Sequence, residues 1–155
     1  MNRIRPIAIC IFRRNDRILV AEGYDPVKEE HFYRPLGGGI EFGEYSDQTI
    51  HRELREEIQA DVSELTYLGT HENIYVFNGT PGHQIVRVYD GLLKDEMLYE
   101  QPVIVGQELD IETSFQAVWK DIQEFREGRS ILYPTGLLEM LTEEDRAQTE
   151  ETSDG

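Results

Sequence analysis

Residues 38–60 read GGIEFGEYSDQTIHRELREEIQA, and this stretch is the most informative part of the chain. Within it, Glu53, Glu56 and Glu57 stand at positions i, i+3 and i+4. If the segment is helical, that spacing places three carboxylates on one face. Like charges at i and i+4 cost about 0.2–0.5 kcal/mol, and the negative end of the helix dipole disfavours anions further. A divalent cation that prefers oxygen ligands, Mg²⁺ or Mn²⁺, would remove both penalties.

The apolar residues of the same stretch define the buried side of the predicted helix. Ile50, Leu54 and Ile58 recur with helical spacing. The glutamates flank that stripe on one side, so we expect them at the border of the buried face, where a cleft can form. A solvated acidic helix in an acidic protein is the alternative, and it would be favoured if the spacing were ignored.

The spacing gives the stretch a recognisable pattern, Gly-x5-Glu-x7-Arg-Glu-aliphatic-x-Glu-Glu, which starts at Gly38 and includes Glu44. This pattern resembles the Nudix box, the signature of the Nudix hydrolases. The resemblance extends over about residues 3–142 and implies an α/β fold, an α/β/α sandwich with a mixed β-sheet. At Gln59 the chain departs from the family, which has a glycine there. Glycine would end the helix more sharply in the left-handed region, but Gln59 removes no metal ligand.

The resemblance also implies which residues form the site. The expected metal ligands are Glu53, Glu56, Glu57 and Glu44. The expected catalytic residues are Glu53, Glu56 and Arg52, with Arg52 orienting a glutamate by an ion pair. The expected substrate contacts are Gly38, Gly39 and Arg34. The general base is either a glutamate of the box or a later acid, for which the candidates are Glu100, Glu108 and Glu112.

A metal-bound diphosphate suits such a site, because metal ions neutralise phosphate charge and lower the pKa of bound water. The predicted function is therefore metal-dependent hydrolysis of the diphosphate bond in a nucleoside diphosphate linked to another group. Two alternatives remain open. One is a nucleotide-binding sensor without turnover, and the other is an RNA 5′-end pyrophosphohydrolase. The complete set of box glutamates favours the enzyme.

Composition limits the partners. The chain has 155 residues with 15 Lys and Arg against 31 Asp and Glu, a net charge of −16. This balance argues against a broad surface for duplex nucleic acid and leaves a small nucleotide as the expected partner. No apolar run approaches the ~20 residues needed to span a membrane. The single Cys10 permits no intrachain disulfide, which fits a cytoplasmic protein. The sequence leaves a homodimer open.

The rest of the chain is predicted to form one domain over residues 1–142. Strands are expected at 4–12, 17–21, 31–36, 65–77, 83–93 and 115–119, and the two longest of the later ones should form a hairpin. Helices are expected at 46–59, with Ser46 as N-cap, and at 121–127 and 135–141. Polar loops are expected at 23–30 and 94–112, the latter with strand character around 102–105. Residues 143–155 carry six acids and one arginine and are predicted to be a disordered tail.

Overall fold

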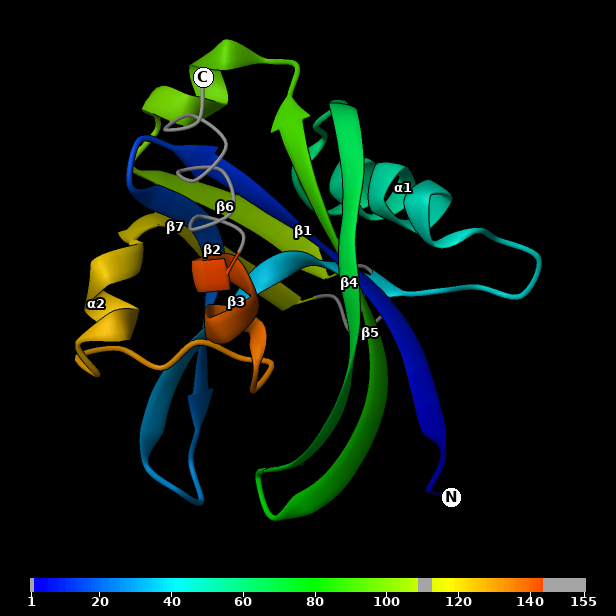
Figure 1. The fold of residues 1–155 in the computed structure, drawn as a ribbon, viewed down its shortest axis with the longest axis vertical. Helices are drawn as coiled ribbons and strands as arrows, with labels where there is room; N and C mark the ends of the chain where they lie inside the picture. The colour runs from blue at the N-terminus through cyan, green and yellow to red at the C-terminus, as the bar shows by residue number, and fades with distance from the viewer. Residues whose placement is uncertain (1, 109–112, 144–155) are drawn as a thin grey trace.

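The computed structural model describes residues 2–108 and 113–143, which form a mixed sheet with helices on both faces (Figure 1). The strands are β1 (Ile4–Arg14), β2 (Arg17–Asp25), β3 (Glu30–Gly39), β4 (Val62–Phe77), β5 (Thr80–Leu93), β6 (Val103–Glu108) and β7 (Thr113–Asp121). Their order in the seven-stranded sheet is β4-β5-β1-β3-β2-β7-β6. Only the β1–β5 pairing is parallel among the pairings of the described strands. The helices are α1 (Ser46–Ile58), the short 3-10 helix η1 (Glu96–Glu100), α2 (Ile122–Arg126) and a last helix over residues 137–143.

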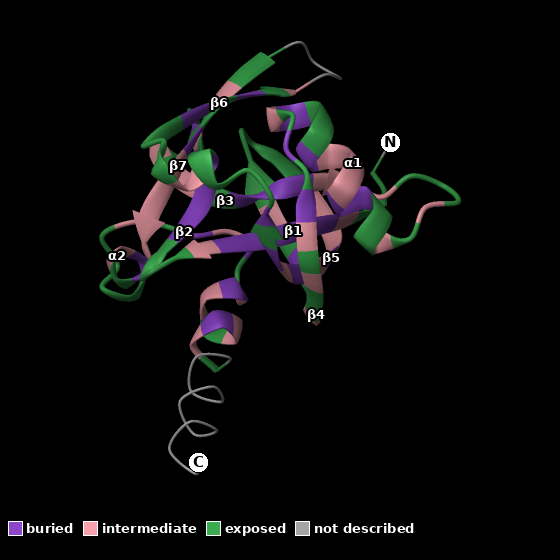
Figure 2. Ribbon diagram, turned by 90° about the horizontal axis from the view of Figure 1, so that it is seen from above, coloured by how far each residue is buried: buried purple, intermediate pink, exposed green. Residues whose placement is uncertain are grey.

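The strand β1 is buried on both faces from Ala8 to Phe12, the later part of the stretch 4–12 for which the sequence predicts it, whereas residues 4–6 are exposed. Cys10 and Phe12 belong to the core beneath α1, together with Leu54. Ile9 and Ile11 point the other way, into a second core that α2 and the last helix cover. Figure 2 shows this burial along β1 and β2 at the centre of the molecule. Two helical layers therefore enclose one mixed sheet, which confirms the predicted fold class.

The hairpin predicted from residues 65–77 and 83–93 is also confirmed. β4 and β5 pair antiparallel from Val62 opposite Leu93 to Phe77 opposite Thr80. The turn between them contains Asn78 and Gly79, both with positive φ. Residues of this type tolerate the left-handed conformation that a tight hairpin turn requires.

The predicted loop over residues 23–30 is wrong in extent, because β2 continues through Gly23 to Asp25. The ring of Phe32 lies directly against the α-carbon of Gly23, where any side chain would collide with it. The Asp25 carboxylate then accepts a hydrogen bond from the backbone N–H of Val27 at 3.0 Å and closes a shorter turn. A glycine that reads as a loop signal is therefore a packing position within a strand.

The predicted loop over residues 94–112 is wrong for much of its described part, 94–108, while residues 109–112 lie outside the described residues. Asp95 caps η1 by accepting a hydrogen bond from the backbone N–H of Met97 at 3.0 Å. β6 follows and pairs antiparallel with β7, which places Ile104 in the core beneath α1. The strand character predicted around residues 102–105 was thus the informative signal.

The ends of α1 correct one prediction and support another. Ser46 is the first helical residue, and the N-cap is Tyr45, whose backbone N–H donates to Oε1 of Gln48 at 2.8 Å. Ser46 lies one position inside the helix, and its hydroxyl instead shares a hydrogen bond with the Tyr89 hydroxyl. At the other end, Gln59 has φ 56° and ψ 38°, the left-handed conformation that the family's glycine would adopt.

The C-terminal helix begins at residue 137, two residues later than predicted, and continues past the predicted end at 141 to residue 143, the last described one. Glu143, the first residue of the predicted tail, is still helical, and the rest of the tail, 144–155, lies outside the described residues. Among the described residues, no helix is long and apolar enough to cross a membrane.

Candidate active site

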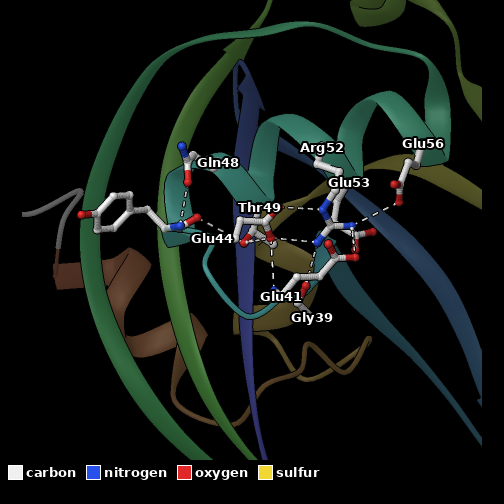
Figure 3. Close-up of polar contacts among 9 residues, drawn as sticks. Gly39, Glu41, Glu44, Gln48, Thr49, Arg52, Glu53 and Glu56 are labelled. Carbon is white, nitrogen blue, oxygen red and sulfur yellow. Dashed lines mark hydrogen bonds and ion pairs between the residues drawn. The ribbon is translucent and has the colours of Figure 1, made fainter.

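The guanidinium of Arg52 is the centre of the glutamate cluster (Figure 3). Its Nε donates to Oε2 of Glu44 at 2.8 Å, and its Nη2 donates to Oε1 of Glu44 at 3.0 Å. Its Nη1 donates to Glu53 at 2.9 Å and to Glu56 at 3.2 Å. Nη2 also donates to the carbonyl oxygen of Gly39 at 2.9 Å. One side chain of α1 thus ties the end of β3 to three of the four expected metal ligands, one of them in the following loop.

The carboxylate of Glu44 has both oxygens occupied. Besides Arg52, it accepts hydrogen bonds from the Thr49 hydroxyl at 2.6 Å and from the backbone N–H of Glu41 at 3.2 Å. The hydrogen bond from Arg52 is the main reason that the pKa of Glu44 falls to about 2. Sequence reasoning missed Thr49, although it precedes Arg52 by one helical turn and therefore shares its side of α1.

Glu53 and Glu57 form a close carboxyl pair. Glu57 is only 6% exposed, and the two side chains share a hydrogen bond. Burial, and then the bond and charge of Glu53, raise the pKa of Glu57 to about 9. Burial also raises the pKa of Glu53. A buried carboxyl group and a half-buried one this close need either a shared proton or a cation between them.

Gly38 permits this arrangement from the neighbouring strand. A Cβ atom at Gly38 would meet the Glu53 carboxylate, with Oε1 at 2.5 Å. Gly38 lies opposite Ala8 in the β1–β3 pairing, so the strand cannot move away without losing that ladder. Gly39 differs, because a Cβ there would meet only the end of the Arg5 side chain at 3.4 Å.

The structure also brings Arg34 and Glu108 to the cluster. Arg34 Nη2 lies 2.9 Å from Oε1 of Glu108, and the charges of both residues act on the pKa of Glu57 in opposite directions. Glu100 lies before β6, whereas Glu108 ends it, and Glu100 faces Arg14 at 3.6 Å instead of the cluster. Glu112, the third candidate base, lies outside the described residues.

The donor set suits a divalent cation. Glu41, Glu44, Glu53 and Glu56 all lie within 4 Å of the single guanidinium of Arg52, so negative charge exceeds positive charge. Within residues 2–108 and 113–143, no three His, Cys, Asp or Glu side chains already enclose a metal position. The reason is visible in the contacts, since Arg52 holds Glu53 and Glu56 while Glu57 bonds to Glu53. The carboxylate oxygens fit Mg²⁺ or Mn²⁺ when Glu53 and Glu57 are both deprotonated.

Comparison with known proteins agrees with this geometry. The sequence profile of the NUDIX domain matches residues 2–140. The chain belongs to the Nudix family.

Two curated relatives show how far the similarity extends. The NAD-capped RNA hydrolase NudC of Pseudomonas syringae pv. tomato is 35% identical over 68 residues, which are 44% of this chain and 24% of that protein. The protein of the same name from Vibrio atlanticus gives the same values. This Nudix chain therefore matches about a quarter of the length of these relatives.

Solved structures show the same fold at low identity. A NUDIX hydrolase from Nitrosomonas europaea aligns with a TM-score of 0.65 and 15% identity, over 94% of this chain and 90% of that one. A structure described as an ADP compounds hydrolase aligns with a TM-score of 0.60 and 17% identity, over 93% and 74% of the two chains. A MutT NUDIX hydrolase from Burkholderia pseudomallei gives 0.58 and 18%, over 79% and 86%.

Proposed function

We propose that this Nudix protein hydrolyses the diphosphate bond of a nucleoside diphosphate linked to another group, with Mg²⁺ or Mn²⁺ as cofactor. The observation that carries the proposal is the Glu53–Glu57 pair, in which Glu57 is buried, the neighbouring Glu53 raises its pKa, and the nearby Arg52 is shared with three further glutamates. A purely structural helix gains nothing from such a pair, because an apolar residue at Glu57 would avoid the cost of burying a carboxyl group. A site that receives a cation and a charged substrate does gain from it.

In this proposal Glu53, Glu56 and Glu57 hold the metal, and Glu44 contributes mainly by fixing Arg52. A bound divalent ion would neutralise the phosphate oxygens and lower the pKa of bound water. Arg52 keeps Glu53 and Glu56 oriented through its Nη1. Gly38 lets the Glu53 carboxylate approach the strand, where a larger residue would displace it.

Arg34 and Glu108 are proposed to act on the substrate side of the cluster. Arg34 would exchange its bond to Glu108 for a substrate phosphate, since a guanidinium binds both groups by the same two-pronged geometry. Glu108 would then be released as a proton acceptor for the attacking water. It is the later acid that we favour as general base, beside the box glutamates Glu53 and Glu56.

A second candidate is hydrolysis at a capped RNA end, which the names of the curated relatives suggest. The net charge of −16 weighs against affinity for a long RNA, because such affinity comes largely from Lys and Arg. We therefore place small nucleotides first. A nucleotide sensor without turnover remains the alternative of a different class.

The decisive experiment is a screen of nucleotide substrates with added Mg²⁺ or Mn²⁺, with products identified by mass. It should include NAD, ADP-ribose, dinucleoside polyphosphates and NAD-capped RNA. Cleavage between two phosphates that stops in chelator, and in the Glu53→Gln variant, is the expected result. Binding without product by the metal-loaded protein would support the sensor, and cleavage of capped RNA alone would support the second candidate.

We also propose that residues 1–142 act as a single domain in the cytoplasm, because Cys10 is a buried free thiol and disulfides are rare there. A homodimer remains a prediction.

A further inference from the structure

A second cationic position lies on the same face of the sheet as α1. Arg87 alternates along β5 with Val86 and Val88, which point into the opposite core. Its side chain therefore lies on the α1 face, and its Nε approaches the Ser46 hydroxyl at the start of α1 at 3.5 Å. Its Nη1 donates to the Thr70 hydroxyl at 3.0 Å.

Two tyrosines complete this position. The Arg87 guanidinium lies over the ring of Tyr67, 4.3 Å from its centroid, and Nη1 also donates to the Tyr67 hydroxyl at 3.3 Å. The Tyr89 hydroxyl bonds to Ser46, and its ring meets that of Tyr67 at 5.8 Å. We call Arg87, Ser46, Tyr67, Thr70 and Tyr89 the hydroxyl cluster.

The charge balance of the cluster is unusual for this chain. Acidic residues outnumber basic ones by 31 to 15, yet within the described part of the chain no carboxylate lies within 4 Å of Arg87. Neutral hydroxyls take the place of the missing counterion. Nη2 makes no hydrogen bond to a described residue, and Arg87 and Tyr67 are both partly accessible. A half-buried guanidinium without an anion has paid a desolvation cost that an anion would repay.

We propose that the hydroxyl cluster is a phosphate-binding site. The free Nη2 offers two N–H groups to phosphate oxygens, and the neighbouring hydroxyls can rotate to donate to the same oxygens. The Tyr67 ring holds the guanidinium plane in place, which lowers the entropy lost on binding. A carboxylate could use the same donors less completely, because it has fewer oxygens.

The hydroxyl cluster lies on the same side of α1 as the glutamate pair. Ser46, Glu53 and Glu57 are seven and eleven residues apart along α1, spacings that return to one side of an α-helix. The axial rise puts Ser46 about 10 Å from Glu53 and about 16 Å from Glu57. The bound phosphate would therefore be either a distal group of an extended substrate, which rests on the proposed function, or a free phosphate ion.

The last described helix lies on the other face of the sheet from the hydroxyl cluster. Over residues 137–143 it packs Leu137 and Leu141 into the core on that opposite face. Met140 of that helix lies against Gly69, on the other side of β4 from Thr70. The chain thus leaves its last described residue on the face away from the hydroxyl cluster.

The test is an NMR titration of the full chain with inorganic phosphate in excess chelator. The chemical shifts of the backbone amides of Ser46 and Thr70 report binding. Without metal, the glutamate cluster around Arg52 repels phosphate, so phosphate binding at that cluster does not interfere with the titration. We expect saturable shifts in the wild type and in the control Arg3→Gln, which removes the same charge from an exposed position. Arg87→Gln should weaken binding at least about tenfold, and Arg87→Lys should fall between them.

Absence of saturable shifts in the wild type, or equal affinity in Arg87→Gln and Arg3→Gln, would overturn the proposal. If Arg87→Gln fails to fold, unchanged affinity in Arg87→Lys would overturn it as well. The source of the phosphate follows from the metal-loaded enzyme. A raised KM with unchanged kcat in Arg87→Gln assigns the site to the substrate, and an unchanged KM assigns it to free phosphate. Both results support a phosphate-binding site at the hydroxyl cluster. The titration in chelator tests that site even if the protein hydrolyses no substrate.

Discussion

Arg52 binds both oxygens of Glu44 through two different nitrogens, at 2.8 and 3.0 Å. This pair joins the loop before α1 to the middle of the helix, eight residues further along the chain. Because Arg52 also holds Glu53 and Glu56, the Glu44–Arg52 pair fixes a charge at the centre of the cluster. Glu44 therefore influences a bound metal through Arg52.

Replacing Glu44 should cost stability as well as activity. Glu44→Gln removes the charge from a largely buried pair, and we expect the free energy of unfolding to fall by about 2 kcal/mol. Glu41→Gln is the matched control, since Glu41 also faces Arg52, at 3.6 Å, but its side chain is 67% exposed. It should cost less than ~0.5 kcal/mol. Urea denaturation measures both, and equal losses would show that the Glu44 pair has no special role.

The carboxyl pair should be essential for turnover. Glu53→Gln and Glu57→Gln each remove a charged ligand, so kcat should fall by at least ~10²-fold in each. Glu64→Gln is the control, because Glu64 is an exposed acid just beyond α1 and should be silent. The measurement is a steady-state assay with saturating Mg²⁺. If both ligand variants kept near-normal rates, the active site would lie elsewhere.

Adjacent glycines should respond very differently to a methyl group. Gly38→Ala puts a Cβ onto the Glu53 carboxylate, and we expect kcat to fall ~10-fold or more, with ~1–3 kcal/mol of overpacking. Gly39→Ala meets only the flexible end of Arg5 and keeps the carbonyl that Arg52 uses, so kcat should stay within about threefold. Equal effects of the two substitutions on kcat would contradict the close approach at Gly38.

Residues 38–60 predict much of this local geometry, because helical spacing alone brings Glu53, Glu56 and Glu57 together. Spacing also identifies Ile50 and Leu54 as core, and both are fully buried. The fold class follows from the resemblance and from the two-sided apolar pattern of residues 4–12.

What the sequence could not supply are contacts between distant segments. Arg34 and Glu108 meet across 74 residues, and no local pattern relates them. Gly23 reads as a loop residue until the ring of Phe32 is known to cover it. The sequence favours Ser46 as the N-cap, but Ser46 is the first helical residue, and the partner of its hydroxyl, Tyr89, lies 43 residues away.

The left-handed residue at the end of α1 should tolerate the family's glycine. Gln59 has φ 56°, a conformation that costs a residue with a Cβ about 1 kcal/mol, so Gln59→Gly should raise the free energy of unfolding by about that amount. Gln59→Ala is the control, because it shortens the side chain but keeps the strain. Calorimetry or urea denaturation can compare the free energies of unfolding of the two variants. A loss of stability in Gln59→Gly would contradict the left-handed C-cap at Gln59.

Metal binding should release a proton near pH 7. In the metal-free protein the pKa of Glu57 is about 9, against an ordinary 4.5, so the folded state holds a proton that the unfolded state loses. Stability from this group is complete below about pH 4.5 and is lost as the pH rises towards 9. Mg²⁺ needs the deprotonated carboxylate, so its affinity should increase over the same range.

Calorimetric titration with Mg²⁺ in two buffers of different ionisation enthalpy should report close to one proton released at pH 7. Glu57→Gln should abolish the release, whereas Glu64→Gln should keep it. Equal heats for the wild type in both buffers would show that Glu57 is already ionised without the metal.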